Sequence, residues 1–336
     1  MTIKDIAREC GCAVGTVSRV LNNHPDVSEK TRARVMAVVE RRGFVVNANA
    51  QQLKSQERKN LAILVQGTSS TLLNSLLERI LRTLESSSYT ASVIILDEND
   101  DEGANATRIY FSLKPLGIVF LGGNPDRLGG DFEKVHVPSV LISNSAEVLG
   151  SGYISSVSSD NRKAAASSTR LLIKNGHRKI GVIGGSLDSA LSRDRYDGFL
   201  RAMKAAKLPF DQEKSYAVSK YSYDGGFSAA GELMERDPEI TAIFTMSDAM
   251  AIGAIRKLRD MGKSVPDDIS VVGFDGIPMS EFSIPRLATV RQMVDRMADD
   301  GLSTLIDKIE NGTRPSHNIV PFELVEGESV RDISRK

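Results

Sequence analysis

The sequence predicts two different folds in one chain: an all-α head at the N-terminus, followed by an α/β body of two lobes with doubly wound parallel sheets. Three observations predict this arrangement. Short helical patterns fill the first 45 residues, apolar runs alternate with amphipathic stretches after residue 60, and the formal charge changes sign between the two regions. The 336 residues are enough for two or three domains with buried cores.

The charge of the chain is unevenly distributed, although 43 basic and 43 acidic residues cancel overall. Residues 1–60 carry eleven Lys and Arg against six Asp and Glu, so this segment has a charge of +5 and the rest of the chain −5. A basic end on an acidic body is typical of a protein that binds a polyanion with one end. A solvated surface with a chance excess of charge has the same composition, so charge alone leaves DNA binding open.

Three helical patterns make up the head. The first covers residues 3–10, where apolar side chains recur every three or four positions and Gly11 follows as a stop signal. The second covers residues 14–22, and the third runs from an N-cap at Ser28 to Gly43. Two short helices joined by a glycine-containing turn are typical of a helix-turn-helix.

The polar face of residues 14–22 has the chemistry that a DNA major groove requires. Arg19 can donate two hydrogen bonds to guanine, and the polar groups of Thr16, Ser18 and Asn22 can reach phosphates. An ordinary three-helix cap can carry the same side chains by chance. The ordered set, rather than any single residue, favours DNA binding.

Residues 2–53 resemble the DNA-binding head of the lactose-repressor (LacI/GalR) family of bacterial transcription regulators, in TIKDIARECGCAVGTVSRVLNNHPDVSEKTRARVMAVVERRGF and in NANAQQL. The resemblance implies that bases are read by Val14, Gly15 and Arg19. It implies that phosphates are contacted by Thr2, Thr16, Ser18, Asn22, Ser28 and Thr31. The partner would be double-stranded operator DNA.

By the same resemblance, residues 47–54 are a hinge helix that forms on operator DNA. This helix pushes Leu53 into the minor groove, where Ala50 is compact enough to fit. An inserted leucine unstacks a base step and kinks the duplex, at a cost of roughly a few kcal/mol that wider contact offsets. Without DNA the same residues read as a polar linker. The two descriptions are compatible if the helix forms on binding.

Three residues of the head depart from the family's pattern. Ala13 stands where a serine N-cap is usual, which removes a cap worth about 1 kcal/mol. Val46 replaces a common proline before the hinge. Gly15 has no side chain that could hydrogen-bond a base, and Val14 offers only apolar contact, for instance to a thymine methyl group. We therefore expect Arg19 to carry most of the direct base readout.

After residue 60, apolar runs alternate with helical stretches. The runs are LAILV (61–65), ASVIIL (91–96), GIVFL (117–121), SVLI (139–142), KIGVIGG (179–185), TAIFTM (241–246) and ISVVGF (269–274). Helical spacing occurs in residues 73–87, 161–176, 193–206, 224–236 and 247–262. Strands buried on both faces and separated by helices indicate parallel βαβ units. Since about 270 residues are too many for one sheet, we expect two lobes.

Polar side chains follow six of these runs, at the strand ends where ligands bind in parallel sheets. They include Gln66, Asn124, Ser143, Arg193, Arg195, Ser247 and Asp275. Any one of them could instead cap the next helix. The six positions together favour a cleft between the two lobes.

The body also resembles the effector-binding core of the same family, which is similar to periplasmic sugar-binding proteins. The stretches are SSDN (158–161), NGHRKIGVIGG (175–185), RDRYDGF (193–199), SDAMAIGAI (247–255), VPDDISVVGFDG (265–276) and LATVRQ (287–292). The resemblance implies that the effector site contains Arg195, Asp275, Ser247, Ser143, Tyr221 and Leu72. It also implies two lobes joined by three crossovers.

This cleft departs from the family's sugar sites. Ser143 stands where an aspartate is frequent, and Leu72 and Leu73 stand where aromatic residues commonly face the ligand. The chain has no tryptophan to stack on a sugar ring. We expect a small polar effector, a sugar or sugar derivative, while its identity and its sign as inducer or corepressor stay open.

The domain boundaries follow from these patterns. We expect a helix-turn-helix domain at 1–45, a hinge and linker at 46–60, an effector-binding and dimerisation core at 61–330, and a tail at 331–336. Within the core, the N-lobe is expected at 61–157 and 291–318, and the C-lobe at 158–290 and 319–330. The eleven residues after Val325 contain no heptads, so no tetramerising coiled coil is expected.

Other protein classes lack support. No P-loop, G-x-S-x-G elbow or H-E-x-x-H motif occurs, and the four histidines have no metal-binding spacing, so we expect no enzyme activity, no cofactor and no metal. Cys10 and Cys12 cannot form a disulfide framework. No apolar stretch approaches the roughly 18 residues of a membrane span, and the first ten residues do not resemble a signal peptide. A cytoplasmic protein is expected.

The sequence therefore predicts a DNA-binding transcription regulator, a repressor controlled by an effector in the cleft. One head covers only half a site, so we expect a homodimer on near-palindromic operator DNA. Two alternatives share some of these features. An architectural DNA-binding protein would need the head without the cleft, and a solute-binding receptor would need the cleft without the head.

Overall fold

The computed structural model describes residues 2–21, 24, 26–42, 59–67, 70–97, 100–150 and 152–334. The chain divides into two compact units, Met1–Arg58 and Lys59–Lys336, and each is described by itself. Several positions singled out in the sequence lie outside the described residues: Asn22, Val46, Ala50, Leu53 and the hinge at 47–54. No helix in the described part of the chain is long and apolar enough to cross a membrane.

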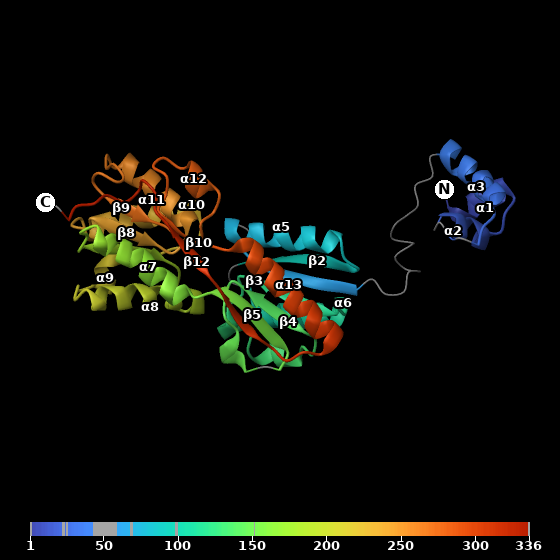
Figure 1. Ribbon diagram of the computed structural model, residues 1–336, viewed down its shortest axis with the longest axis horizontal. Coiled ribbons are helices and arrows are strands. Elements are labelled where there is room, and N and C mark those ends of the chain that lie inside the picture. Colours follow the sequence, from blue (N-terminus) through green and yellow to red (C-terminus); the bar gives the residue numbers. More distant parts are fainter. Residues whose placement is uncertain are drawn as a thin grey trace. The chain divides into compact units, whose positions relative to one another are not determined.

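The first unit packs three helices, α1 (Ile3–Cys10), α2 (Val14–Leu21) and α3 (Glu29–Arg42), around a small apolar core (Figure 1). Gly11 ends α1 in the left-handed conformation with φ of 62°, which turns the chain towards α2. Ala13 precedes α2, and its carbonyl accepts hydrogen bonds from the backbone N–H groups of Thr16 and Val17. Its methyl side chain cannot cap a further N–H group.

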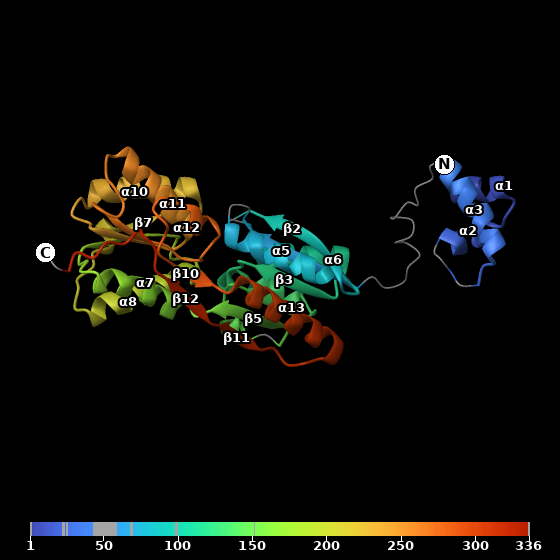
Figure 2. The ribbon, with the colours of Figure 1, turned by 45° about the horizontal axis from the view of Figure 1, so that its top comes forward.

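The N-lobe of the second unit is built on a six-stranded parallel sheet in the order β11-β5-β4-β3-β1-β2. Its strands are β1 (Lys59–Gln66), β2 (Tyr89–Leu96), β3 (Gly117–Leu121), β4 (Ser139–Ile142), β5 (Ile154–Ser159) and β11 (His317–Val320). Three helices cover it: α5 (Thr71–Glu85), α6 (Glu102–Leu113) and α13 (Val294–Asn311). Figures 1 and 2 show α5 and α13 next to each other over this sheet.

Strand β1 shows why the strands of this lobe appear in the sequence as continuous apolar runs. Leu61, Ile63 and Val65 belong to the core cluster that includes α5 and α13. The alternate residues Ala62 and Leu64 belong to a second cluster, which includes α6. Successive side chains of a strand point to opposite faces, so a strand covered on both sides needs apolar residues at every position.

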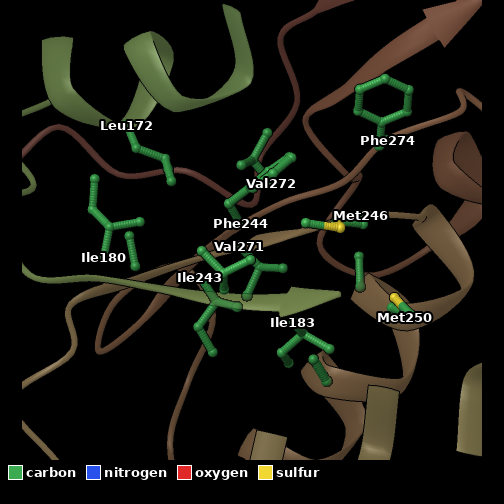
Figure 3. Close-up of a cluster of buried hydrophobic side chains, with 14 of the residues drawn as sticks. Leu172, Ile180, Ile183, Ile243, Phe244, Met246, Met250, Val271, Val272 and Phe274 are labelled. Atoms are coloured by element: carbon green, nitrogen blue, oxygen red, sulfur yellow. The ribbon is translucent and has the colours of Figure 1, made fainter. Parts of the chain in front are cut away.

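The C-lobe is built on a four-stranded parallel sheet in the order β7-β6-β8-β9. Its strands are β6 (Ile180–Gly184), β7 (Tyr216–Val218), β8 (Ala242–Thr245) and β9 (Ser270–Val272). Its helices are α7 (Asn161–Lys174), α8 (Ala190–Ala205), α9 (Gln212–Ser215), α10 (Tyr223–Arg236), α11 (Asp248–Asp260) and α12 (Met279–Phe282). Figure 3 shows the core of this lobe, where Leu172 points from its helix towards strand residues such as Ile180 and Ile243.

The chain passes between the lobes three times. Strand β5 ends in the N-lobe sheet at Ser159, and α7 of the C-lobe begins at Asn161. The second passage runs through β10 (Thr289–Gln292) to α13, and the third runs from β11 through β12 (Phe322–Val325) (Figure 2). Strands β10 and β12 pair antiparallel. The three crossovers agree with the expectation from the sequence.

Some elements of the body were not predicted. Strand β5 has the sequence ISSVSS and was assigned to no element, yet all six of its residues are buried. Helices α6 and α13 were also missed. The apolar runs of the sequence do form β1 to β4, β6, β8 and β9, with ends shifted by up to two residues.

Helices α10 and α11 pack through glycines. A Cβ atom on Gly226 would lie 2.1 Å from the carbonyl oxygen of Met250, and one on Gly253 would lie 2.0 Å from the carbonyl oxygen of Tyr223. Real Cβ atoms do not approach backbone this closely, so the two helix backbones are in direct contact. The glycines are therefore a packing requirement of the C-lobe.

The first prediction concerns this contact. Gly253→Ala should lower the free energy of unfolding of the body by about 2 kcal/mol or more, because the added methyl group forces the helices apart. Alanine is the better helix former by about 1 kcal/mol, so a net loss isolates the clash. Urea unfolding followed by circular dichroism measures it, since the chain has no tryptophan.

Gly129→Ala is the matched control, because φ there is −70° and a Cβ atom would meet nothing within 4 Å. Its free energy of unfolding should stay close to that of the unchanged chain. Equal stabilities of the Gly253 and Gly129 variants would contradict the direct backbone contact.

Candidate functional site

A cavity of about 470 Å³ lies between the two lobes, at the carboxyl ends of their strands. From the N-lobe it is lined by residues that include Gln66, Ser70, Leu72, Leu73, Glu102, Asn124 and Ser143. From the C-lobe it is lined by residues that include Ser192, Arg195, Lys220, Tyr221 and Asp275. The lining combines hydrogen-bonding groups with an apolar wall of leucines. This combination suits a small polar molecule that also has an apolar face.

Arg195 is a deeply buried charged group of the cavity wall, with 2% of its surface exposed. Helix α8 presents it, and its Nε atom donates to Asn161 Oδ1 at 3.0 Å. One terminal nitrogen donates to the backbone oxygen of Met246 and the other to Asp275 Oδ1 at 3.3 Å. The guanidinium lies 3.8 Å from the centre of the Phe274 ring. A buried guanidinium is tolerated because these partners replace water.

Asp275 follows β9 and has an unusual backbone conformation. Its φ of 116° lies in a region that side chains rarely adopt, and its backbone N–H donates to Val290 O at 2.8 Å. Its Oδ1 atom also accepts from Gln292 Nε2 at 2.9 Å. Burial raises the pKa of Asp275 to about 6, against the Arg195 charge and the Gln292 hydrogen bond, which both lower it. The carboxyl group is thus held in a strained, largely dry position.

Asp248 lies behind this pair. Its Oδ2 atom accepts from the backbone N–H of Ile277 at 2.8 Å, and its Oδ1 atom accepts from the Thr289 hydroxyl at 2.6 Å. Burial, and then the charge of Asp275, raise the pKa of Asp248 well above its ordinary value. It does not line the cavity, so it supports the turn that carries Asp275.

The structure places five of the six expected effector residues in one cavity: Leu72, Ser143, Arg195, Tyr221 and Asp275. The Tyr221 hydroxyl lies 2.9 Å from Ser192 Oγ, and its ring lies 5.9 Å from the Arg195 guanidinium. Ser143 has a φ of 84°, and its backbone N–H donates to Val157 O.

Ser247 departs from the expectation. It is not among the residues that line the cavity, and its Oγ atom caps α11 by accepting from the backbone N–H of Met250 at 3.2 Å. Arg193 is also outside this cavity and forms an ion pair with Asp126. The alternative of a helix cap, which the sequence left open, describes Ser247.

Glu102 is a cavity residue that sequence reasoning missed. It is the first residue of α6, is 1% exposed, and both of its carboxylate oxygens accept from the backbone N–H of Asn124 at 3.0 Å. Burial raises the pKa of Glu102 to about 7, while the Asn124 hydrogen bond and the Arg127 charge lower it. The pair Asp101-Glu102 before an amphipathic stretch was the available signal, as an N-cap followed by an acid in the first turn.

In the head, the three residues expected to read bases lie together on α2 and are exposed. Val14 is 41% exposed, and Gly15 has open space where a Cβ atom would be. Arg19 lies in the last turn of the same helix. Val17 and Val20 face the core, so α2 presents its other side to solvent.

The residues expected to hold phosphates lie mainly at helix starts. The Thr2 hydroxyl, before α1, donates to Asp5 Oδ2 at 2.9 Å. Ser28 precedes α3, and its Oγ atom accepts from the backbone N–H of Thr31 and lies 2.9 Å from the Thr31 hydroxyl. Thr16 and Ser18 are half-buried on α2.

No group of three or more metal-ligating side chains is found in the described part of the chain. Cys10 is a buried core residue of the head, and burial raises the pKa of its thiol. Cys12 accepts a hydrogen bond from Arg34 at 3.0 Å. Both cysteines therefore belong to the packing of the helix-turn-helix.

The second prediction concerns Glu102. Its pKa of about 7 in the folded chain exceeds the ordinary value of 4.5, so its ionisation costs stability as the pH rises between these values. Glu102→Gln removes this loss. The free energy of unfolding of the variant, relative to that of the unchanged chain, should therefore rise by up to about 3 kcal/mol between pH 4.5 and values above pH 7. Urea unfolding of both proteins from pH 4.5 to pH 8.5 measures the difference. The contributions of Asp248 and Asp275 to the pH dependence of stability cancel in this difference, because both proteins contain these residues.

Glu133→Gln, which neutralises an exposed acid of the same lobe, is the control and should show no such trend. A difference between Glu102→Gln and the unchanged chain that stays constant over this pH range would show that Glu102 does not titrate near neutrality.

Comparison with known proteins gives matches to both parts of the chain. Residues 2–47 match the model described as bacterial regulatory proteins, lacI family, and residues 169–330 match a periplasmic binding protein-like domain. Among solved structures, a complex of the transcriptional regulator CelR with cellobiose is similar, with a TM-score of 0.73, 26% identity, and 98% and 99% of the two chains covered. A lac repressor dimer bound to operator and an anti-inducer shares the fold, with a TM-score of 0.78, 21% identity, and 98% and 99% coverage.

Relatives match over nearly the full length. The chain is 35% identical to the HTH-type transcriptional regulator MalR of Clostridium butyricum, over 99% of this chain and 100% of that protein. It is 32% identical to catabolite control protein A of Priestia megaterium, over 87% of each chain. With a helix-turn-helix head, a two-lobed body and relatives of this similarity, the chain belongs to the lacI family of bacterial regulatory proteins.

Proposed function

We propose that this chain is a transcriptional repressor whose affinity for operator DNA is controlled by a sugar or sugar derivative bound between the lobes. The observation that carries the proposal is the interlobe cavity, which presents the buried pair Arg195 and Asp275, in a chain that also has an exposed helix α2 with Arg19. The chain performs no reaction and needs no cofactor or metal in this role. A regulator that meets its operator on the chromosome acts in the bacterial cytoplasm.

The cavity chemistry supports a polyol effector. Arg195 supplies donors and Asp275 an acceptor, and hydroxyl and amide side chains such as Ser143 and Asn124 add neutral partners. Leu72 and Leu73 provide an apolar wall for the C–H face of a ring. One structural neighbour of this chain is a regulator complexed with cellobiose. A polar ligand whose hydroxyl groups pair with buried polar groups is selected strongly against analogues that lack them.

The head supports sequence-specific binding. We propose that α2 enters the major groove, where Arg19 reads guanine and Val14 and Gly15 approach the bases closely. The hydroxyls of Thr2, Thr16, Ser18, Ser28 and Thr31, with the amide of Asn22, would hold phosphates. Ala50 and Leu53 of the hinge would contact the minor groove.

Exposed apolar surface of the body supports a homodimer. Val93 and Ile95, which are 39% and 59% exposed, lie on β2, the edge strand of the N-lobe sheet. In the C-lobe, Phe282 and Ile284 are 77% and 89% exposed, at the end of α12. Apolar patches and bare sheet edges of this kind are normally covered by a partner.

The effector controls the operator through the closure of the lobes. A ligand that binds one closure state more tightly shifts the population towards that state, with a coupling of about 1–3 kcal/mol. In a dimer, closure changes the spacing of the two hinges, which orders or melts residues 47–54 on the DNA. An architectural DNA-binding protein has no need of this coupling.

The third prediction tests base readout. Arg19→Ala should reduce the preference for an operator, selected from randomised palindromes with the unchanged chain, over random duplex by about 10- to 100-fold, because a bidentate base contact is worth about 1–3 kcal/mol. Fluorescence anisotropy at fixed salt measures both affinities. Arg8→Ala, which removes an exposed charge from α1, should leave the ratio unchanged. Retention of the full preference by the Arg19 variant contradicts the proposal.

The fourth prediction tests the effector site with a defined panel of maltose, cellobiose, ribose, glucose 6-phosphate and hypoxanthine. The compound that raises the melting temperature of the unchanged chain is then titrated by calorimetry. Asp275→Asn should weaken binding by about tenfold or more, because a charge-assisted hydrogen bond is lost. Ser247→Ala should bind within twofold of the unchanged chain, although loss of the α11 cap costs about 1 kcal/mol of stability.

Equal losses of affinity in the Asp275 and Ser247 variants would place the ligand elsewhere. DNA binding that ignores both sequence and every compound of the panel would favour the architectural alternative. Strong ligand binding with no DNA affinity at low salt would favour the solute-binding receptor.

A further inference from the structure

The segment 122–127, which follows β3, lies between the main cavity and a second one. Asn124 and Arg127 line the main cavity, whereas Pro125 and Asp126 line a cavity of about 430 Å³ that also lies between the lobes. The start of α8 is divided in the same way. Its residues Ser192 and Arg195 line the main cavity, and Ala190 and Arg193 line the second. The segment and the start of α8 therefore form the partition between the two cavities.

Two contacts join this segment to the other lobe. The Asn124 Oδ1 atom accepts from the backbone N–H of Ala190 at 3.4 Å. The Asp126 carboxylate forms an ion pair with Arg193, whose guanidinium also donates to the backbone oxygens of Leu187 and Asp188 at 3.0 Å and 2.9 Å. We call the segment 122–127 together with the residues 187–193 the lobe clasp. Any change of lobe closure must keep or break these contacts.

The N-lobe side of the clasp is held by Glu102. Both carboxylate oxygens accept from the backbone N–H of Asn124, and a Cβ atom on Gly123 would lie 2.7 Å from Glu102 Oε2. The next residue of α6 is also close to the segment, since a Cβ atom on Gly103 would lie 3.2 Å from the backbone oxygen of Arg127. The start of α6 therefore fits the segment without intervening space.

Above pH 7, where Glu102 is ionised, its charge strengthens this contact. Its carboxylate is 1% exposed, and the Asn124 N–H group donates to both of its oxygens at 3.0 Å. A hydrogen bond to a buried carboxylate is about twice as strong as one between neutral groups. Asn144 adds a weaker hold, by donating to the backbone oxygen of Gly123 at 3.3 Å.

We propose that Glu102 is a positioning residue of the effector cavity: by holding Asn124 it places the segment 122–127 so that the clasp joins the two lobes. Since Glu102 itself lines the main cavity, a ligand hydroxyl that donates to its carboxylate competes with the Asn124 N–H group and loosens the clasp. Occupancy of the cavity is then transmitted to the lobe contact through one side chain. The effector role of the cavity rests on the proposed function, whereas the contact itself does not.

Hydrogen exchange of the full chain, with no DNA or ligand added, tests the contact. Glu102→Ala should raise the exchange rates of the segment 122–127 and of the residues 187–193 by about tenfold, because loss of a hydrogen bond to a charged group opens both sides of the clasp. Glu102→Gln keeps one accepting oxygen and should restore most of the protection. Glu133→Ala, an exposed acid of the same lobe, is the control.

The residues 187–193 provide the decisive readout, because they belong to the other lobe and none of their hydrogen bonds in the described structure involves Glu102. Faster exchange confined to the segment 122–127 would mean that Glu102 acts only within its own lobe, and this would overturn the inference. Asp126→Asn tests the same clasp from a half-exposed position that tolerates substitution. Unchanged exchange at the residues 187–193 in this variant would also overturn it.

Failure of the clasp and failure of the proposed function are separable. Exchange needs neither operator nor effector, so a lost clasp with intact binding in the compound panel leaves the repressor proposal standing. A clasp that behaves as described, in a chain that binds no compound of the panel, would leave Glu102 as a determinant of lobe contact alone.

Discussion

The buried guanidinium of Arg195 is the interaction on which the body of this protein depends. It collects partners from four places: Asn161 at the start of α7, Met246 after β8, Asp275 after β9, and the Phe274 ring beneath it. A charge in this position is tolerable only while every partner is in place, since removal of one leaves an unpaired buried group. The arginine thereby fixes where three strand ends lie relative to one another.

The ion pair of Arg195 and Asp275 connects the cavity to the passages of the chain between the lobes. Asn161 follows the passage from β5 to α7, and Gln292, which donates to Asp275, ends β10 just before the passage to α13. A ligand that contacts Arg195 or Asp275 therefore contacts a hydrogen-bond partner of Asn161 or Gln292, the residues next to these two crossovers. This geometry gives a physical reason why a molecule in the cavity should favour one lobe closure over another. Within the C-lobe, the glycine contact holds the backbones of α10 and α11 directly against each other.

Much of the fold was predictable because its physical signals are local. Continuous apolar runs such as LAILV predict strands covered on both faces, and Gly11 indicates the end of α1. Strand β5 was not predictable in this way, because four of its six residues are serines. Ser155, Ser156 and Ser158 are buried, and partners distant in sequence, such as the His317 ring at 2.9 Å from Ser156 Oγ, make these polar residues suitable for a strand. No local pattern contains that information.

The candidate site likewise contains residues that the sequence could predict and residues that it could not. Arg195 and Asp275 were found because polar residues after buried strands gather at one edge of a parallel sheet. Ser247 satisfies the same rule, yet its hydroxyl caps α11, and only the three-dimensional structure distinguishes the two roles. Glu102 was missed because its importance comes from burial against a loop that follows a different strand. Burial of a lone acid is a tertiary property.

The interleaved path of the chain has a consequence for its synthesis on the ribosome. The head is a compact unit that precedes the body in the chain, so it leaves the ribosome before the body and can fold earlier. Neither lobe of the body can do so, because β11 completes the N-lobe sheet and β12 pairs with β10, while Ser329 accepts a backbone hydrogen bond from Val271. Both lobes thus wait for the same closing stretch of polypeptide. A nascent chain that stalls before this stretch presents a folded head on an unfinished body, whose exposed apolar surface makes it prone to aggregation.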